Sequence, residues 1–209
     1  MQDGLSLRDL AKIEDFSPRL VWGSGPLLLV RADGHDKDAP VMFSTPVDPG
    51  VVETAEILVG EHVLNDYVSP GAVVVPVRKT DRNPFSNAVI AGRSATCDLR
   101  FDDKSISKVH AYLYPPENRG GGWTIQDQNS TNGTWVNGIM LEKGEVLRIP
   151  WSSEVRLGHV RAIFLGPEEL ESTVDYAQAA WKLAAGKETE KTAADTDDDW
   201  KPEPDAGDE

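Results

Sequence analysis

Three short groups of polar and charged residues occur in order between residues 92 and 138, and their side chains can bind an anion together. The groups are Gly92-Arg93-Ser94 with Thr96-Cys97-Asp98, then Ser105–Ala111, then Asp127–Gly138. Arg93 carries a planar guanidinium that donates two parallel hydrogen bonds to one oxyanion, a geometry that lysine cannot copy. Ser107 and Thr131 add hydroxyl donors, and Lys108 adds a point charge. Each group alone is weak evidence for a binding site, but the three groups together favour the binding of a single phosphate.

The same residues do not suggest catalysis. The four histidines, His35, His62, His110 and His159, have no metal-ligand spacing with one another or with Cys97. A phosphatase thiolate at Cys97 needs an arginine six residues later, where this chain has Asp103. There is also no Walker loop, nucleophile elbow or dinucleotide fingerprint. We therefore predict a protein that is not an enzyme and that uses no metal and no cofactor.

Short apolar runs separated by turn signals must position these residues. Turns are predicted at Asn132-Gly133 and Asn137-Gly138. The runs rich in β-branched and aromatic residues are Val73–Val77, Ala88–Ala91, Leu99–Phe101, His110–Tyr114, Trp123–Ile125, Thr134–Val136, Val146–Ile149, Glu154–Leu157 and Ala162–Leu165. This spacing predicts an all-β, antiparallel sandwich or barrel.

The ordered motifs on these strands resemble the forkhead-associated (FHA) domain family. The matching residues are Gly92-Arg93, Cys97-Asp98, Ser107–His110, Ser130–Thr134 and Asn137-Gly138, with Leu157-Gly158 near the end. The resemblance covers about residues 71–166. It implies an eleven-stranded antiparallel β-sandwich that binds phosphothreonine peptides through loops at one end.

The resemblance also implies roles for single residues. The expected phosphopeptide-binding residues are Arg93, Ser107, Lys108, Thr131, Asn132 and Asn137. By resemblance, Asn132 grips the peptide backbone, Asn137 supports the loops or touches the peptide, and His110 braces the loop that holds Ser107. Gly92 and Gly133 are expected to support the site, because a side chain would obstruct a tight turn there. Many family members have arginine at the position of Lys108, so the bidentate contact is lost here.

The segments on either side of residues 71–166 have different patterns. Residues 1–70 form an N-terminal extension of unknown role, with a predicted helix over 5–16, capped by Ser6, and predicted strands within 19–32 and 40–45. The pattern of residues 51–62 is compatible with either a strand or a helix. The pattern of residues 167–186 predicts a helix that ends at Gly186. Its apolar stripe, from Leu170 to Ala184, is expected to pack on the sandwich. Residues 187–209 predict a disordered acidic tail.

Charge is distributed unevenly along the chain. The net charge is −14 over 209 residues, made up of −7 in residues 1–70, +3 in 71–166, −3 in 167–186 and −7 in 187–209. The acidic balance argues against nucleic acid and anionic membranes as partners. One cysteine, the absence of an apolar run long enough to span a bilayer and the lack of a leader pattern predict a cytoplasmic protein.

Two functions from different classes fit this pattern. The first is a non-catalytic phosphothreonine-binding adaptor, whose partner is a phosphothreonine-containing protein, either a Ser/Thr kinase or its substrate. The alternative is a phospho-independent protein interaction scaffold on the same fold. A narrower hypothesis is that Thr192 or Thr196, each with an aspartate three residues later, is phosphorylated and binds this domain.

Overall fold

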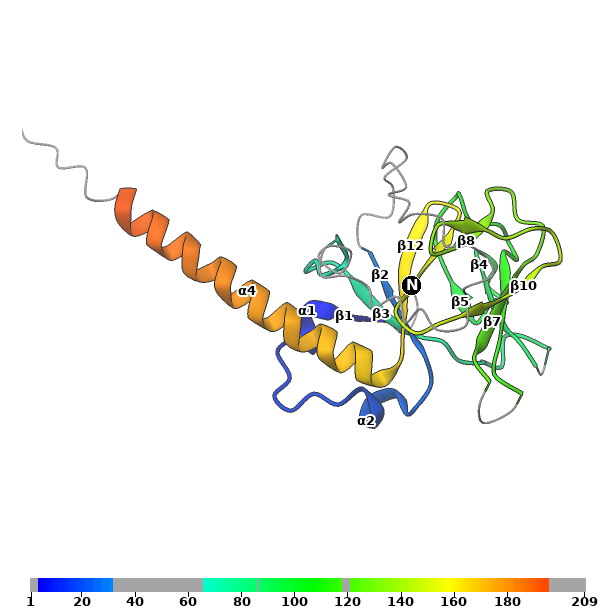
Figure 1. Ribbon diagram of the computed structural model, residues 1–209, viewed down its shortest axis with the longest axis horizontal. Coiled ribbons are helices and arrows are strands. Elements are labelled where there is room, and N and C mark those ends of the chain that lie inside the picture. The colour runs from blue at the N-terminus through cyan, green and yellow to red at the C-terminus, as the bar shows by residue number, and fades with distance from the viewer. Residues whose placement is uncertain (1–3, 32–65, 86, 118–120, 196–209) are drawn as a thin grey trace, which may run out of the picture.

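The computed structural model describes residues 4–31, 66–85, 87–117 and 121–195, the last ten by their backbone only. The predicted strand at 40–45 and the ambiguous segment 51–62 lie outside these residues, as does Thr196. In the described part of the chain, strands form two sheets, of seven strands in the order β1-β3-β2-β12-β11-β8-β9 and of five in the order β10-β7-β6-β4-β5 (Figure 1). The strands are β1 (Leu5–Ser6), β2 (Leu27–Val30), β3 (Val73–Pro76), β4 (Val89–Gly92), β5 (Leu99–Arg100), β6 (Ala111–Tyr114), β7 (Trp123–Asp127), β8 (Thr134–Val136), β9 (Ile139–Met140), β10 (Val146–Ile149), β11 (Ser153–Leu157) and β12 (Val160–Leu165).

The prediction of an all-β sandwich is confirmed. The sheets enclose one apolar core, because strands such as β11 alternate between buried Val155 and Leu157 and more exposed Glu154 and Arg156. Two details differ from the expected eleven antiparallel strands. The described residues contain twelve strands, and β4 pairs with β5 in parallel.

Strand β2 comes from the N-terminal extension but lies inside the larger sheet. It pairs with both β3 and β12, with Leu28 opposite Val75 and Phe164. All four of its residues are buried because both faces of the sheet are covered there, Leu28 by the sandwich core and Leu29 by a second apolar cluster. The division between residues 70 and 71 stays a prediction, but the sheet itself extends across it.

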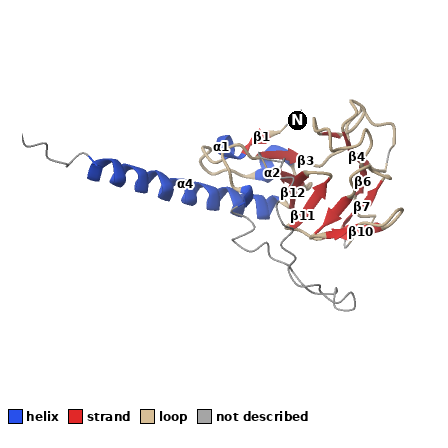
Figure 2. Ribbon diagram, turned by 90° about the horizontal axis from the view of Figure 1, so that it is seen from above, coloured by secondary structure: helices blue, strands red, loops and turns tan. Residues whose placement is uncertain are grey.

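The second cluster joins the outer face of the larger sheet to the helices. Helix α4 (Pro167–Asp195) contributes Leu170, Val174 and Ala177, which are buried, and Trp181, which is partly buried. The predicted apolar stripe therefore packs on the protein's own sheet through its first three turns. From there α4 projects away from the sandwich (Figure 2), and Ala184 is exposed.

The helix does not end where the sequence pattern indicated. Gly186 lies inside α4, and residues 187–195, expected to be disordered, are its last turns. A glycine inside a helix costs only about 1 kcal/mol, and the Lys, Glu and Ala residues that follow it are strong helix formers. Residues 196–209 are not among the described ones.

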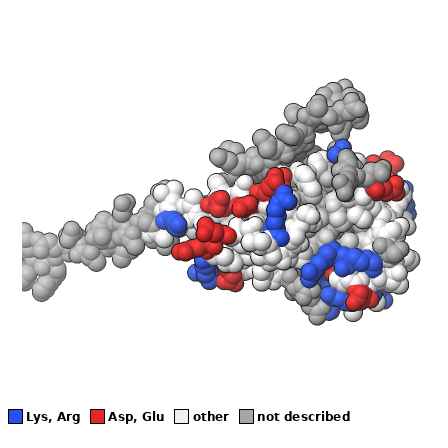
Figure 3. Space-filling model, turned by 90° about the horizontal axis from the view of Figure 1, so that it is seen from below, with Lys and Arg blue, Asp and Glu red and all other residues white. Residues whose placement is uncertain are grey.

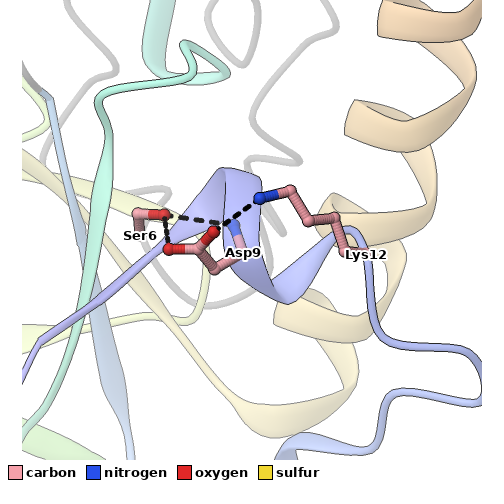
Figure 4. Close-up of polar contacts among 3 residues, drawn as sticks. All are labelled: Ser6, Asp9 and Lys12. Atoms are coloured by element: carbon pink, nitrogen blue, oxygen red, sulfur yellow. Dashed lines mark hydrogen bonds and ion pairs between the residues drawn. The ribbon is translucent and has the colours of Figure 1, made fainter.

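The predicted helix over residues 5–16 is much shorter in the structure. Helix α1 (Leu7–Leu10) begins at Ser6, whose Oγ accepts a hydrogen bond from the Asp9 backbone N–H at 3.1 Å and donates one to the Asp9 carboxylate at 2.8 Å (Figure 4). Lys12 completes this group with an ion pair to Asp9. The cap was predicted correctly, but the chain then turns and starts again as α2 (Pro18–Trp22). The backbone leaves the helical conformation before Asp15, whose φ of +52° lies in the left-handed region, and Ser17 is extended because Pro18 follows it. None of the described helices could span a bilayer.

Candidate functional site

Loops that follow β4, β5 and β7 meet at one end of the sandwich and form a surface pocket of about 260 Å³. The residues that line it are Arg93, Lys104, Ser105, Ile106, Ser107, Lys108, Thr131 and Asn132. Five of the six side chains expected to bind the ligand are therefore brought together by the fold. Among the described residues, the lining contains three cationic side chains and no carboxylate.

Arg93 is held at the pocket by its backbone and by one nitrogen of its side chain. Its backbone N–H donates to the Ser107 carbonyl at 2.9 Å, and its Nε donates to the Ile106 carbonyl at 3.2 Å. These contacts orient an otherwise exposed guanidinium. No described residue hydrogen-bonds to its two terminal nitrogens, so both remain available for an oxyanion.

Ser107 connects two of the loops. Its Oγ accepts a hydrogen bond from the Thr131 backbone N–H at 3.0 Å and lies 3.4 Å from the Thr131 Oγ1. Because that Oγ accepts from a backbone donor, its own hydrogen can be donated to a ligand in the pocket. Asn132 makes a second link between the same loops, since its Nδ2 donates to the Ser105 carbonyl at 2.8 Å. No residue in the described part of the chain donates to the side-chain oxygen of Asn132, which can therefore accept from a ligand.

His110 lies beneath the pocket and is fully buried. Its Nδ1 accepts a hydrogen bond from the Ser107 backbone N–H at 3.1 Å, so its protonated Nε2 donates to the Gly133 carbonyl at 2.9 Å. Burial lowers the pKa of the imidazole, although the bond to Gly133 and the charge of Asp127 act in the opposite direction. A neutral His110 therefore joins the second loop to the third, which is the bracing role that the family resemblance implied.

Asp127 fixes the third loop, a role that the sequence reasoning did not assign. Its carboxylate accepts hydrogen bonds from the Ser130 backbone N–H, the Ser130 hydroxyl and the Thr134 hydroxyl, at 2.6–2.8 Å. Burial raises the pKa of this carboxyl, but these hydrogen bonds outweigh it and the pKa lies below its usual value. The pattern of an aspartate three residues before a serine was the available signal.

A second buried aspartate anchors the start of β4. Asp98 accepts hydrogen bonds from Ile90, Asn83 and Thr80. Burial raises its pKa, and the hydrogen bonds again outweigh that effect and lower it. Asp98 therefore stays ionised and ties the segment before β4 to the loop that carries Arg93.

Small residues let the second loop lie against β4. A Cβ on Gly92 would collide with the carbonyl oxygen of Lys108 and would lie 2.9 Å from the Cys97 Sγ. Cys97 is buried, and its thiol donates to the same carbonyl at 3.2 Å. Gly133 is required for a different reason, since its φ of +79° is rarely adopted by other residues.

Two residues lie differently from the sequence expectation. Asn137 does not line the pocket, because its side chain donates to the Ser153 Oγ at 3.2 Å and accepts from the Glu154 N–H at 2.9 Å. It fixes the turn after β8 to β11. Lys104 does line the pocket but was not predicted. The only signal in the sequence was the position of Lys104 in the basic segment 71–166, between the group that ends at Asp98 and the group that begins at Ser105.

Charge on the surface is segregated on the face shown in Figure 3. Basic side chains gather on the sandwich, whereas most of the acidic ones lie nearer to the long helix (Figure 3). This agrees with the segment charges of +3 for residues 71–166 and −3 for residues 167–186.

Comparison with known proteins gives a family for part of the chain. Residues 89–158 match the family model of the FHA domain. No curated protein matches the chain.

Several solved structures are similar to the chain. Mycobacterium tuberculosis EmbR in complex with a low-affinity phosphopeptide is 20% identical, with a TM-score of 0.36, over 44% of this chain and 21% of that one. This chain thus spans about a fifth of EmbR. The FhaA FHA domain complexed with the intracellular domain of Rv3910 is 18% identical, with a TM-score of 0.37, over 67% and 99%. The MEK1 FHA domain in complex with a HOP1 phosphothreonine peptide is 24% identical, with a TM-score of 0.36, over 44% and 87%.

Proposed function

We propose that this chain, which contains an FHA domain at residues 89–158, is a non-catalytic adaptor that binds phosphothreonine peptides in Ser/Thr kinase signalling. The observation that carries the proposal is the pocket itself. Cations from two loops and hydroxyl donors from two loops converge on one surface, to which no residue of the described ranges contributes a carboxylate.

The chemistry of the ligand matches that of the pocket. A phosphothreonine carries a charge of about −1.5 to −2 and three strong acceptor oxygens. The two terminal nitrogens of Arg93 bind two of these oxygens, and the hydroxyls of Ser107 and Thr131 donate to the phosphate. Lys108 adds charge at the rim. Asn132 presents its side-chain oxygen to a backbone N–H of the peptide.

Asn137 has a supporting role in this proposal. It holds the turn after β8 through Ser153 and Glu154 and does not contact the peptide. Gly92, His110 and Gly133 shape the loops. A Ser/Thr kinase or its substrate supplies the phosphothreonine, and we expect the encounter in the cytoplasm, where the thiol of Cys97 stays reduced.

The test is a binding assay with paired peptide libraries that differ only in phosphorylation of the central threonine. Only the phosphorylated set should bind. Arg93→Ala should weaken binding by about 2 kcal/mol or more, as for other truncated charge pairs that a partner covers. Arg93→Lys should recover part of this, because it keeps the charge but loses the fork.

The matched control is Arg148→Ala, since Arg148 is an exposed arginine of β10 outside the pocket. Equal binding of phosphorylated and unphosphorylated peptides would refute the proposal and favour a phospho-independent scaffold. So would equal losses from Arg93→Ala and Arg148→Ala.

A further inference from the structure

A row of arginines crosses the outer face of the larger sheet. Trp135 of β8 lies opposite Arg156 of β11, which in turn lies opposite Arg161 of β12. The Arg31 N–H continues the row, because it donates to the Arg161 carbonyl at 3.2 Å. These side chains point outward, since the neighbouring Val155 of β11 points into the core. We call the four residues the arginine row, and none of them lines the pocket.

The helices on this face of the sheet do not extend over the arginine row. Leu29 and Ile163, two residues away from Arg31 and Arg161, belong to the second apolar cluster that includes α4. Tyr67 marks the boundary, because its ring centroid lies 5.9 Å from the Arg161 guanidinium carbon. All four residues of the arginine row are partly exposed.

The arginine row carries more positive charge than the carboxylate beside it balances. Glu154 Oε1 accepts hydrogen bonds from Arg161 Nε and from the Tyr67 hydroxyl, both at 2.6 Å. Arg156 lies directly opposite Arg161, and like charges in this position repel each other. Burial lowers the pKa of Arg156 most, Glu154 raises it, and Arg161 lowers it further. Three guanidinium groups and this one carboxylate leave a net charge of +2.

Trp135 holds the guanidinium of Arg156 in a fixed plane. The guanidinium carbon lies 3.5 Å from the centroid of the indole ring. Within the described ranges, the side chains of Arg156 and Arg31 form no hydrogen bond and no ion pair. One face of the Arg156 guanidinium is thus covered by an aromatic ring, and its second face can stack on another. A suitable ligand combines carboxylates with an aromatic side chain.

This chain contains such a segment directly after α4. Residues 196–209 include seven acidic residues, one lysine and one tryptophan, Trp200, so their net charge is −6. Three of the acidic residues, Asp197–Asp199, immediately precede Trp200. Their carboxylates match the N–H groups of the arginines, and the indole matches the second face of the Arg156 guanidinium.

The length of α4 prevents Trp200 from reaching the arginine row of its own chain. Among the described residues, Trp181 is the last one of α4 that packs on the second cluster, and the helix continues to Asp195. At 1.5 Å per residue, Asp195 lies about 21 Å beyond Trp181, on a helix that projects away from the sandwich (Figure 2). Five more residues span about 18 Å at most when fully extended. Trp200 therefore cannot return even to the level of Trp181.

We infer that the arginine row binds segment 196–209 of a second copy of this chain. Trp200 of one copy stacks on Arg156 of the other, and the neighbouring aspartates pair with the arginines. The contact requires no phosphorylation and lies outside the pocket, so the inference is independent of the proposed function.

The first test is sedimentation velocity of the full chain over a range of micromolar concentrations. The sedimentation coefficient of the wild type should rise with concentration, and the rise should shrink with added salt. Trp200→Ala and Arg156→Ala should each weaken self-association about threefold to thirtyfold, the range for a cation–π contact that loses water on binding. Arg156→Lys should not restore it, because the planar group is lost. Arg148→Ala, an exposed arginine of β10 on the smaller sheet, is the matched control and should change nothing.

The second test measures binding of a fluorescent, unphosphorylated peptide of residues 196–209 to the full chain that carries Trp200→Ala. Adding Arg156→Ala to this chain should weaken the binding, whereas adding Arg93→Ala should leave it unchanged. If Arg156→Ala fails to fold, the peptide with and without Trp200→Ala still tests the contact on a folded receptor.

Three results would overturn the inference. A wild-type sedimentation coefficient that is independent of concentration would exclude a second copy as the partner. Loss of peptide binding with Arg93→Ala would place the segment in the pocket. Equal effects of Arg156→Ala and Arg148→Ala would show that only the overall charge of the protein matters.

Discussion

Replacement of His110 by alanine should both destabilise the fold and weaken ligand binding. The imidazole is fully buried and joins the backbone N–H of Ser107 to the carbonyl of Gly133. Alanine leaves both backbone groups without partners in the protein interior. Each unsatisfied buried group costs about 1–3 kcal/mol, so the expected loss of unfolding free energy is about 2–6 kcal/mol. This is a large part of the free energy of unfolding of a typical folded domain, which is roughly 5–15 kcal/mol.

The measurement is denaturant unfolding of the wild-type protein and two variants. His159→Ala is the matched control, because His159 is only partly buried and, within the described structure, its ring forms no hydrogen bond. It should change the unfolding free energy by less than about 0.5 kcal/mol. His110→Ala should also weaken phosphopeptide binding under conditions where it remains folded, since the loops of Ser107 and Gly133 lose their common anchor.

The dependence on pH provides a second readout. The pKa of His110 is lowered in the folded protein, mainly by burial, so the unfolded chain binds this proton more readily than the folded chain. The contribution of neutral His110 to the free energy of unfolding is therefore fully present above the ordinary histidine pKa of about 6.5. It decreases as the pH falls from about 6.5 toward the lowered pKa of the folded protein. The stability difference between wild type and His110→Ala should narrow as the pH falls below about 6.5. Measurements above about pH 5 keep Asp98 and Asp127 ionised, because their pKa values are also lowered.

Two results would refute this reasoning. One is a loss of stability in His110→Ala no greater than that in His159→Ala. The other is a difference between wild type and His110→Ala that stays constant from pH 8 to pH 5, because the histidine would then not be held neutral by the fold.

Two further predictions concern packing. Gly92→Ala places a methyl group against the Lys108 carbonyl and should destabilise the protein by about 1–3 kcal/mol. The control in thermal unfolding is Gly25→Ala, because no atom lies within 4 Å of a methyl group at that position. Equal melting temperatures of the two variants would contradict the predicted clash. A chain that begins at residue 71 lacks β2, the strand between β3 and β12, and should show no cooperative unfolding transition, whereas a sharp calorimetric transition like that of the full chain would show that the sandwich folds without this strand.

Much of the fold could be predicted because its signals are local. Short apolar runs bounded by turns predicted the strands from Val73 to Leu165, and the resemblance to the FHA family implied that loops at one end of them bind the ligand. Ser6 was identified as a helix cap from residue type and spacing alone. These features depend on a few neighbouring residues, so the sequence contains the information directly.

Other features depended on contacts between distant segments. A run such as Leu27–Val30 indicates a strand but cannot indicate which strands it pairs with, and only the folded sheet places it between β3 and β12. The end of helix α4 is a different case, because the strong helix formers after Gly186 outweigh the small cost of one glycine, which by itself indicated a stop.

The sequence by itself determined the kind of site, through residue types that suit an anion and through their order along the chain. Only the tertiary structure decided which residues meet. It brought Lys104 into the pocket and turned Asn137 toward Ser153 and Glu154. The physical reason is that a side chain's chemistry belongs to the residue, whereas its neighbours are set by loop paths that depend on buried hydrogen bonds such as those of His110 and Asp127.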